Sequence, residues 1–142
     1  MRTLHVGLRV ADLDRSLAFY TALGYEVLGS VPETEFGSLT MLKLPGDEFV
    51  TVELVHDPRG GVVGPGGLNH LVIQVESMHA TVADLTARGV QVEAPGSPDG
   101  SEDLWTAWVT DPDGYRIELV QWPPGHPAGM TEADFGDPSE RT

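Results

Sequence analysis

Leu4-His5-Val6-Gly7-Leu8-Arg9-Val10 is the stretch that decides the fold, because it recurs 65 positions later as Asn69-His70-Leu71-Val72-Ile73-Gln74-Val75. Seven pairs of residues at this offset are identical between positions 4 and 28, where ordinary composition gives about one or two. Glu53-Leu54-Val55 recurs in the same way as Glu118-Leu119-Val120. The chain is therefore an internal duplication without a gap, and each copy carries one His and one Glu at equivalent positions.

Each copy is predicted to fold as β-α-β-β-β. In the first copy, apolar alternation predicts strands over Leu4–Val10, Tyr25–Leu28, Leu39–Leu44 and Phe49–Val55, the last two flanking a turn at Pro45-Gly46-Asp47. A helix is expected between a cap at Asp12 and an end at Gly24. In the second copy the helix runs from Ser77 to Gly89, and the strands cover His70–Val75, Val90–Glu93, Trp105–Thr110 and Tyr115–Trp122.

The predicted fold class is α+β, with two tandem βαβββ modules forming a curved mixed β-sheet cavity with flanking helices. The first module is expected over residues 1–57, a Gly-rich linker over 58–67 and the second module over 68–122, all within one domain of residues 1–122. Residues 123–142 are expected to be a flexible acidic tail. Because each module buries only one face, the two need each other, or a second chain, to complete a core.

Composition excludes several classes of partner. The net charge is −14 with only 8 basic residues among 142, which argues against nucleic acid and against an anionic membrane surface. The chain has no cysteine, so disulfides, thiolate nucleophiles and Cys-ligated metals are excluded. No apolar run is long enough for a membrane span, and no signal peptide is evident. We therefore expect a cytoplasmic protein that acts on a small molecule.

The four repeated side chains are candidate metal ligands: His5, Glu53, His70 and Glu118. Each lies on the strand face opposite the main apolar face, so in a curved sheet all four would line a concave cavity. Two imidazoles and two carboxylates suit a divalent ion such as Ni²⁺, Co²⁺, Zn²⁺, Mn²⁺ or Fe²⁺, and a glutamate at such a site can serve as a base. The competing interpretation is a hydrogen-bonded structural histidine and a solvated glutamate in each copy, which a duplication would preserve equally well.

The remaining histidines and two tryptophans give weaker signals. His56, His79 and His126 have no counterpart in the repeat and are expected to be exposed. Trp105 and Trp108 are three residues apart on a predicted strand and therefore face opposite sides, so we expect at most one of them to line the cavity.

Residues 3–122 resemble the vicinal oxygen chelate superfamily, and within it the glyoxalase I-like (lactoylglutathione lyase) group most closely. The most specific segments are Leu4–Val10 followed by Arg15–Tyr20, and Asp111–Leu119. The resemblance implies that His5, Glu53, His70 and Glu118 bind a divalent metal, with Ni²⁺ or Co²⁺ favoured by the short chain. It also implies isomerisation of a thiol–2-oxoaldehyde hemithioacetal to a 2-hydroxyacyl thioester, with Glu118 as the base, Glu53 as its symmetry partner, and a homodimer whose sites form between chains.

The resemblance also assigns two residues to substrate binding. Arg9 matches the arginine that the family uses on the γ-glutamyl carboxylate of glutathione, and Asp57 stands where the family commonly has asparagine. The basic residues that hold the other end of glutathione in some members are not evident: Asp84 stands where some have arginine, and Gly96–Asp103 contains no Lys or Arg. The thiol carrier therefore stays open.

Other functions of the same superfamily are alternatives. A bleomycin resistance-like protein sequesters a drug in the cavity without metal, and such proteins usually lack the four ligands. Extradiol dioxygenases use two His and one Glu, so Glu53 would be surplus. Methylmalonyl-CoA epimerases typically have glutamine at the Glu53 position. The complete set of four ligands favours the lyase.

Overall fold

The computed structural model describes residues 1–135, and the first half of the chain folds into a four-stranded mixed sheet. Its strands are β1 (Val6–Arg9), β2 (Glu26–Thr34), β3 (Gly37–Lys43) and β4 (Val52–His56), arranged in the order β1-β4-β3-β2. β1 runs parallel to β4, and the other neighbours are antiparallel. The hairpin expected around Pro45–Asp47 is confirmed as the β3–β4 pair, although β4 begins three residues later than expected.

The second half forms a separate three-stranded sheet in the order β5-β7-β6. Its strands are β5 (His70–Gln74), β6 (Trp105–Thr110) and β7 (Arg116–Gln121), with β5 parallel and β6 antiparallel to β7. The expected strand at Val90–Glu93 is wrong. That segment makes a backbone hydrogen bond from Glu93 N to Trp108 O, and only Gly96 forms an isolated bridge with Thr106, so the ladder is too irregular to continue the sheet. The α+β class, with two mixed sheets and two helices, is confirmed.

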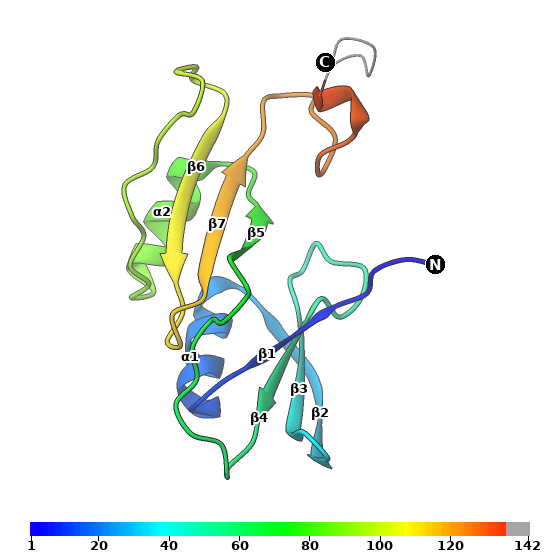
Figure 1. Cartoon of the computed structure of the whole chain (residues 1–142). Helices are drawn as coiled ribbons and strands as arrows, with labels where there is room; N and C mark the ends of the chain where they lie inside the picture. Colours follow the sequence, from blue (N-terminus) through cyan, green and yellow to red (C-terminus); the bar gives the residue numbers. More distant parts are fainter. Residues whose placement is uncertain (136–142) are drawn as a thin grey trace.

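One helix follows the first strand of each half, and both begin as the sequence predicts. In α1 (Leu13–Leu23) the Asp12 side chain accepts a hydrogen bond from Arg15 N, and in α2 (Met78–Ala87) the Ser77 side chain accepts one from Ala80 N. Gly24 and Gly89 follow the helices with φ angles of 123° and 83°, a region that favours glycine. Figure 1 shows both helices on the same side of the molecule. No helix within residues 1–135 has the length and apolar character of a membrane span.

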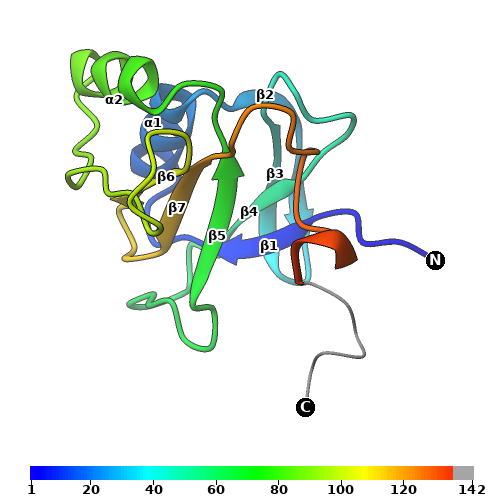
Figure 2. The ribbon, with the colours of Figure 1, turned by 90° about the horizontal axis from the view of Figure 1, so that it is seen from above.

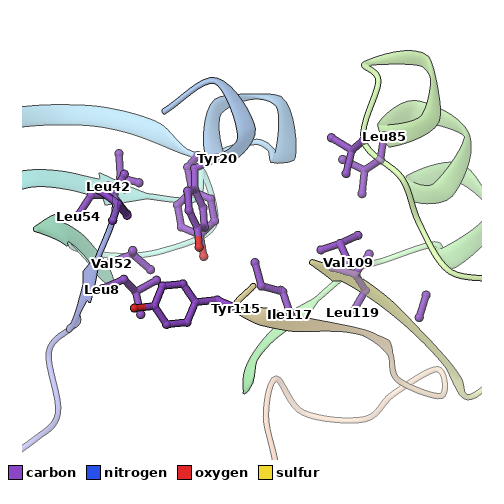
Figure 3. Packing of buried hydrophobic residues seen from close by; sticks show 14 of the residues in the cluster. Leu8, Tyr20, Leu42, Val52, Leu54, Leu85, Val109, Tyr115, Ile117 and Leu119 are labelled. Atoms are coloured by element: carbon purple, nitrogen blue, oxygen red, sulfur yellow. The ribbon is translucent and has the colours of Figure 1, made fainter. Parts of the chain in front are cut away.

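The buried core lies between the sheets and these helices. One face of each sheet supplies it, and Figure 3 shows Leu8, Leu42 and Leu54 of the first half on one side and Val109 and Leu119 of the second half on the other. Tyr20 and Tyr115 lie between the two groups. The opposite face of each sheet is not covered by a helix, which leaves side chains such as Val31 and Val72 exposed.

The turn between β6 and β7 joins the two halves. Asp111 is buried and its carboxylate accepts a hydrogen bond of 2.7 Å from the Tyr20 hydroxyl on α1. Asp113 accepts hydrogen bonds from Ala11 N and the Ser16 hydroxyl, at 3.1 and 3.3 Å. The Tyr115 hydroxyl donates to the carbonyl of Arg9 in β1. The Asp-Pro-Asp-Gly turn is thus a polar junction between modules as well as a hairpin turn.

The segment after β7 makes contacts of its own up to residue 135. It contains a short 3-10 helix (Glu132–Phe135), and the His126 ring stacks on Trp122 with a centroid separation of 4.4 Å. His126 Nε2 also lies 2.5 Å from Asp134 Oδ1. The expected exposure is confirmed for His79, whereas His56 and His126 are half-buried. The flexible tail stays a prediction, and its residues 136–142 lie outside the described part.

Candidate metal centre

The first His/Glu pair lies on the uncovered face of the first sheet. β1 and β4 are parallel neighbours with Gly7 opposite Glu53, so His5, two residues before Gly7, lies on the same face as Glu53. His5 Nε2 is 3.1 Å from Glu53 Oε2. A Cβ at Gly7 would lie 3.9 Å from Glu53 Oε1, so the absence of a side chain at Gly7 keeps space open beside this carboxylate.

The second pair repeats this geometry on the second sheet. β5 and β7 are parallel neighbours with Val72 opposite Glu118, and His70 Nε2 lies 3.4 Å from Glu118 Oε2. The other ring nitrogen, His70 Nδ1, is 2.6 Å from Asn69 Oδ1. Because an amide oxygen only accepts, this contact requires a proton on Nδ1, and a neutral His70 would then have Nε2 as its metal-binding nitrogen. A partner of this kind orients many metal-binding imidazoles. The sequence pattern did not indicate Asn69, which has no matching residue at position 4.

The two pairs do not merge within one chain. Each belongs to a different sheet, and no group of three or more His, Cys, Asp or Glu side chains within residues 1–135 is placed to hold a metal ion. The donors nevertheless fit a divalent ion: each pair offers one imidazole nitrogen and one carboxylate oxygen, side by side and partly exposed. One chain therefore presents two half-sites, and a four-ligand centre requires two such surfaces to meet.

The surroundings of both half-sites are open and partly apolar. Val31 on the first sheet and Val72 on the second are exposed on the same faces as the glutamates, and Val72 retains 55% of its accessible surface. β5, which begins at His70, and β1, which begins directly after His5, are edge strands of their sheets, and Figure 2 shows both from above. Exposed apolar sheet faces of this kind mark binding surfaces. Both half-sites thus lie on surfaces suited to a partner or a ligand.

The two residues assigned to substrate binding lie near the first half-site. Arg9 is exposed on the same face of β1 as His5. Asp57 directly follows β4, and its carboxylate accepts hydrogen bonds from the backbone and side chain of Arg59, which hold the pKa of that carboxyl below its usual range. Asp57 is therefore ionised and already paired with a cation, a different chemistry from the neutral amide of asparagine.

An aromatic and charged cluster borders the second half-site. Trp108 lies opposite Glu118 in the β6–β7 ladder, and its ring meets the His70 imidazole edge-on at a centroid separation of 5.2 Å. The Arg116 guanidinium lies 4.9 Å from the Trp108 ring centroid and is paired with Glu93 at 2.6 Å. Trp105 packs against the core on the other face. The expectation that the two tryptophans face opposite sides of the strand is confirmed. The sequence assigned no role to Arg116 or Glu93, because neither has a counterpart in the repeat.

Comparisons with known proteins identify the family to which the chain is similar. Residues 2–119 match the model of the Glyoxalase/Bleomycin resistance protein/Dioxygenase superfamily. A probable lactoylglutathione lyase of Vibrio cholerae is 34% identical over 138 residues, which cover 91% of this chain and 96% of the relative.

Two solved structures extend the comparison. The trypanothione-dependent glyoxalase I of Leishmania major is 33% identical with a TM-score of 0.66, covering 85% of this chain and 86% of that one. An antibiotic binding protein of a Streptomyces species is 27% identical with a TM-score of 0.62, covering 87% and 98%. The match over nearly the whole duplicated region, with a His/Glu pair on the open face of each sheet, shows that the chain belongs to the Glyoxalase/Bleomycin resistance protein/Dioxygenase superfamily.

Proposed function

We propose that this protein is a metal-dependent glyoxalase I-like lyase, which isomerises the hemithioacetal of a thiol and a 2-oxoaldehyde to a 2-hydroxyacyl thioester. The observation that carries the proposal is the pair of equivalent His/Glu half-sites, at 3.1 and 3.4 Å, on the open faces of the two sheets. The relatives named lactoylglutathione lyase support the same reaction class.

We propose further that the active unit is a homodimer, in which His5 and Glu53 of one protomer meet His70 and Glu118 of the other. Two facts support this arrangement. The half-sites of one chain lie on separate sheets and form no common cluster within residues 1–135. The surfaces around them expose apolar side chains that a second copy would cover.

The donor set supports a borderline divalent ion, with Ni²⁺ or Co²⁺ favoured and Zn²⁺, Mn²⁺ or Fe²⁺ compatible with the same ligands. When bound, such an ion supplies Lewis-acid polarisation of the substrate oxygens. His5 and His70 would hold it through Nε2, and the contact of His70 Nδ1 with Asn69 Oδ1 supports this role for His70, since it occupies the other ring nitrogen. Glu53 and Glu118 would supply the carboxylates.

Glu118 is proposed as the residue that moves the proton. The reaction moves the C–H proton from the thiol-bearing carbon to the neighbouring carbonyl carbon, and a carboxylate that accepts this proton from the first carbon and returns it to the second accounts for that transfer. The hydroxyl proton of the thiol-bearing carbon passes by way of water to the neighbouring oxygen, so the first oxygen becomes the thioester carbonyl and the second becomes the product hydroxyl. Glu118 lies opposite Trp108 of β6 in the antiparallel ladder, and its side chain is 22% exposed, so it is accessible to a bound substrate. Glu53 is its symmetry partner, and Arg9 is proposed to bind a carboxylate of the thiol carrier.

The test combines metal content with turnover. Protein purified without a histidine tag is reconstituted with Ni²⁺ or Co²⁺, its metal is quantified, and thioester absorbance is followed with hemithioacetals of several thiols. Glu118→Gln is expected to retain metal through the other three ligands and to lose turnover, while His70→Ala loses metal. Metal-loaded wild-type protein that forms no thioester from any of these thiols would contradict the lyase assignment.

A metal-free sequestering protein is the second candidate, favoured by the similarity to an antibiotic binding protein and by the exposed apolar faces. The two candidates differ in one observable. Sequestration predicts a ligand affinity that is unchanged by chelators and by Glu118→Gln, whereas the lyase predicts that both abolish turnover.

A further inference from the structure

We propose that Arg116 is an anion-binding residue of the substrate site, which recognises a carboxylate or similar oxyanion on the non-reacting end of the thiol carrier. This inference rests on the proposed lyase function and names a property of its substrate. It follows from the position of Arg116, from the groups that hold it and from the carboxylate that already contacts it.

Arg116 is placed beside the second half-site by the sheet itself. It lies two residues before Glu118 on β7, so the two side chains project from the same face. In the parallel β5–β7 ladder its partner is His70. A molecule bound at His70 and Glu118 therefore has Arg116 as an immediate neighbour along the strand.

Neutral groups hold the guanidinium on this face. It stacks on the Trp108 ring at 4.9 Å from the centroid, and Nη1 donates to the Thr110 hydroxyl at 3.1 Å. The same Trp108 ring meets His70, so the platform under Arg116 is continuous with the half-site. Within residues 1–135 the Nε and Nη2 donors of Arg116 make no hydrogen bond, which leaves part of its donor fork for a ligand.

The ion pair with Glu93 shows that the Arg116 guanidinium binds a carboxylate. Its carboxylate contacts Arg116 Nη1 at 2.6 Å, and both side chains are accessible, with 58% of the Glu93 and 40% of the Arg116 side-chain surface exposed. An exposed ion pair of this kind contributes little net stability, so a ligand carboxylate can replace the glutamate at small cost. A groove of about 600 Å³, lined by Glu93, Trp108, Thr110 and Arg116 together with the end of α2, provides room for it.

The first half-site has no equivalent of this arrangement. Thr51 lies two residues before Glu53, as Arg116 lies before Glu118, and its hydroxyl donates to Asp47 at 2.7 Å. Opposite Glu53 the ladder has Met41 in place of a tryptophan. The cation is therefore a departure from the duplication, as expected for a residue that distinguishes the two ends of a substrate.

Because the chain is strongly acidic, it needs a cationic side chain at the site to bind an anionic substrate. The chain carries a net charge of −14 and only 8 basic residues, and Gly96–Asp103 contains none of them. Arg9 on the first sheet and Arg116 on the second are the two arginines on the ligand-bearing strand faces. A carrier with an anionic group at each end would engage both, one from each protomer of the proposed dimer.

The experiment compares two substrates across three variants. Methylglyoxal hemithioacetals are prepared from glutathione, which carries carboxylates, and from N-acetylcysteamine, which carries none. For Arg116→Gln we expect KM for the anionic substrate to rise by about fivefold to twentyfold, the range for one charge-assisted hydrogen bond at a partly exposed site, with kcat and the neutral substrate little changed. Arg15→Gln on the outer face of α1 removes an equal charge as the matched control and should alter neither substrate.

For Glu93→Gln we expect the opposite change in KM for the anionic substrate. Removing the competing carboxylate should lower KM for the anionic substrate and leave the neutral one unchanged. Equal effects of Arg116→Gln on both substrates, or a fall in kcat or metal content, would overturn the inference, since these are the signs of a purely structural residue. Unchanged kinetics in both variants would overturn it as well.

A binding measurement separates this inference from the lyase assignment. S-hexylglutathione binding is followed by tryptophan fluorescence in metal-loaded wild type and in Arg116→Gln. Weaker binding in the variant supports the anion site even if no hemithioacetal is turned over, in which case only the proposed lyase function fails. Equal affinity, or no binding to either protein, contradicts the anion site.

Discussion

Replacing Tyr20 with phenylalanine tests the junction that holds the two modules together. The Tyr20 hydroxyl is buried and donates to Asp111 Oδ2 at 2.7 Å, across 91 residues of sequence. Asp111 Oδ1 accepts two further hydrogen bonds, from Tyr115 N at 2.8 Å and Asp113 N at 2.9 Å, so the variant leaves Oδ2 without its donor. A hydrogen bond to a charged group contributes about 1.5–3 kcal/mol, so we expect the free energy of unfolding to fall by about 2 kcal/mol.

The effect should depend on pH in a defined direction. Burial raises the pKa of Asp111, and the Tyr20 hydrogen bond opposes that rise because it favours the ionised form. The pKa of Asp111 in the folded variant is therefore higher than in the folded wild type. The stability difference is fully present above that higher pKa and shrinks as the pH falls through it, because a protonated Asp111 loses less when the donor is removed.

The assay is urea unfolding at one fixed protein concentration, at neutral and at acidic pH, with Tyr25→Phe as the matched control. Tyr25 is buried and contacts the Tyr20 ring edge-on at 5.6 Å, yet its hydroxyl makes no hydrogen bond within residues 1–135. Burial raises its pKa to about 12. We expect Tyr25→Phe to change stability by less than about 0.5 kcal/mol. An equal loss in both variants, or none in Tyr20→Phe, would refute the assignment of this stability to the Asp111 bond.

Three further predictions concern other parts of the chain. The His126 imidazole should titrate above the ordinary histidine range because Asp134 accepts from it, and an NMR titration should show a lower pKa in Asp134→Asn; an unchanged value would count against the contact. Gly37→Ala should lower the free energy of unfolding, measured in urea, by at least about 2 kcal/mol, since φ is 105° and the new Cβ would meet backbone atoms of residues 56 and 57. Gly46→Ala is the control: its Cβ would have no atom within 4 Å, so the free energy of unfolding should be nearly unchanged. Removal of bound metal by a chelator should lower the melting temperature, and re-addition should restore it; calorimetry that shows no change would argue against a bound ion.

The duplication made the local structure of the chain predictable. Helix caps at Asp12 and Ser77, the helix ends at Gly24 and Gly89, and the faces of the strands follow from short-range patterns, and the structure confirms them. Sequence symmetry also identified the equivalent His and Glu positions. The approach of each histidine to the glutamate of its own module depends on the parallel pairing of two strands, and it is the structure that shows it.

The arrangement of the modules, and the residues around the His/Glu pairs, could not be predicted from the sequence in the same way. Nothing in the periodicity distinguishes one continuous cavity from two half-sites on separate sheets, since this depends on long-range contacts such as those of Asp111 with Tyr20. Val90–Glu93 alternates like a strand but bonds to β6 too irregularly to be one. Arg116 and Glu93 meet across 23 residues through long side chains, and no spacing rule predicts that contact.

The most direct test of a metal centre shared between chains is the metal content of a purified mixed dimer. One chain carries His5→Ala and Glu53→Gln, the other His70→Ala and Glu118→Gln, and the two are co-expressed with different tags that contain no histidine. If the half-sites pair between protomers, the mixed dimer regains one complete centre and binds one divalent ion, while each parent homodimer binds none. A mixed dimer that binds no metal, beside wild-type protein that does, would show that the four ligands come together within one chain and would contradict the account.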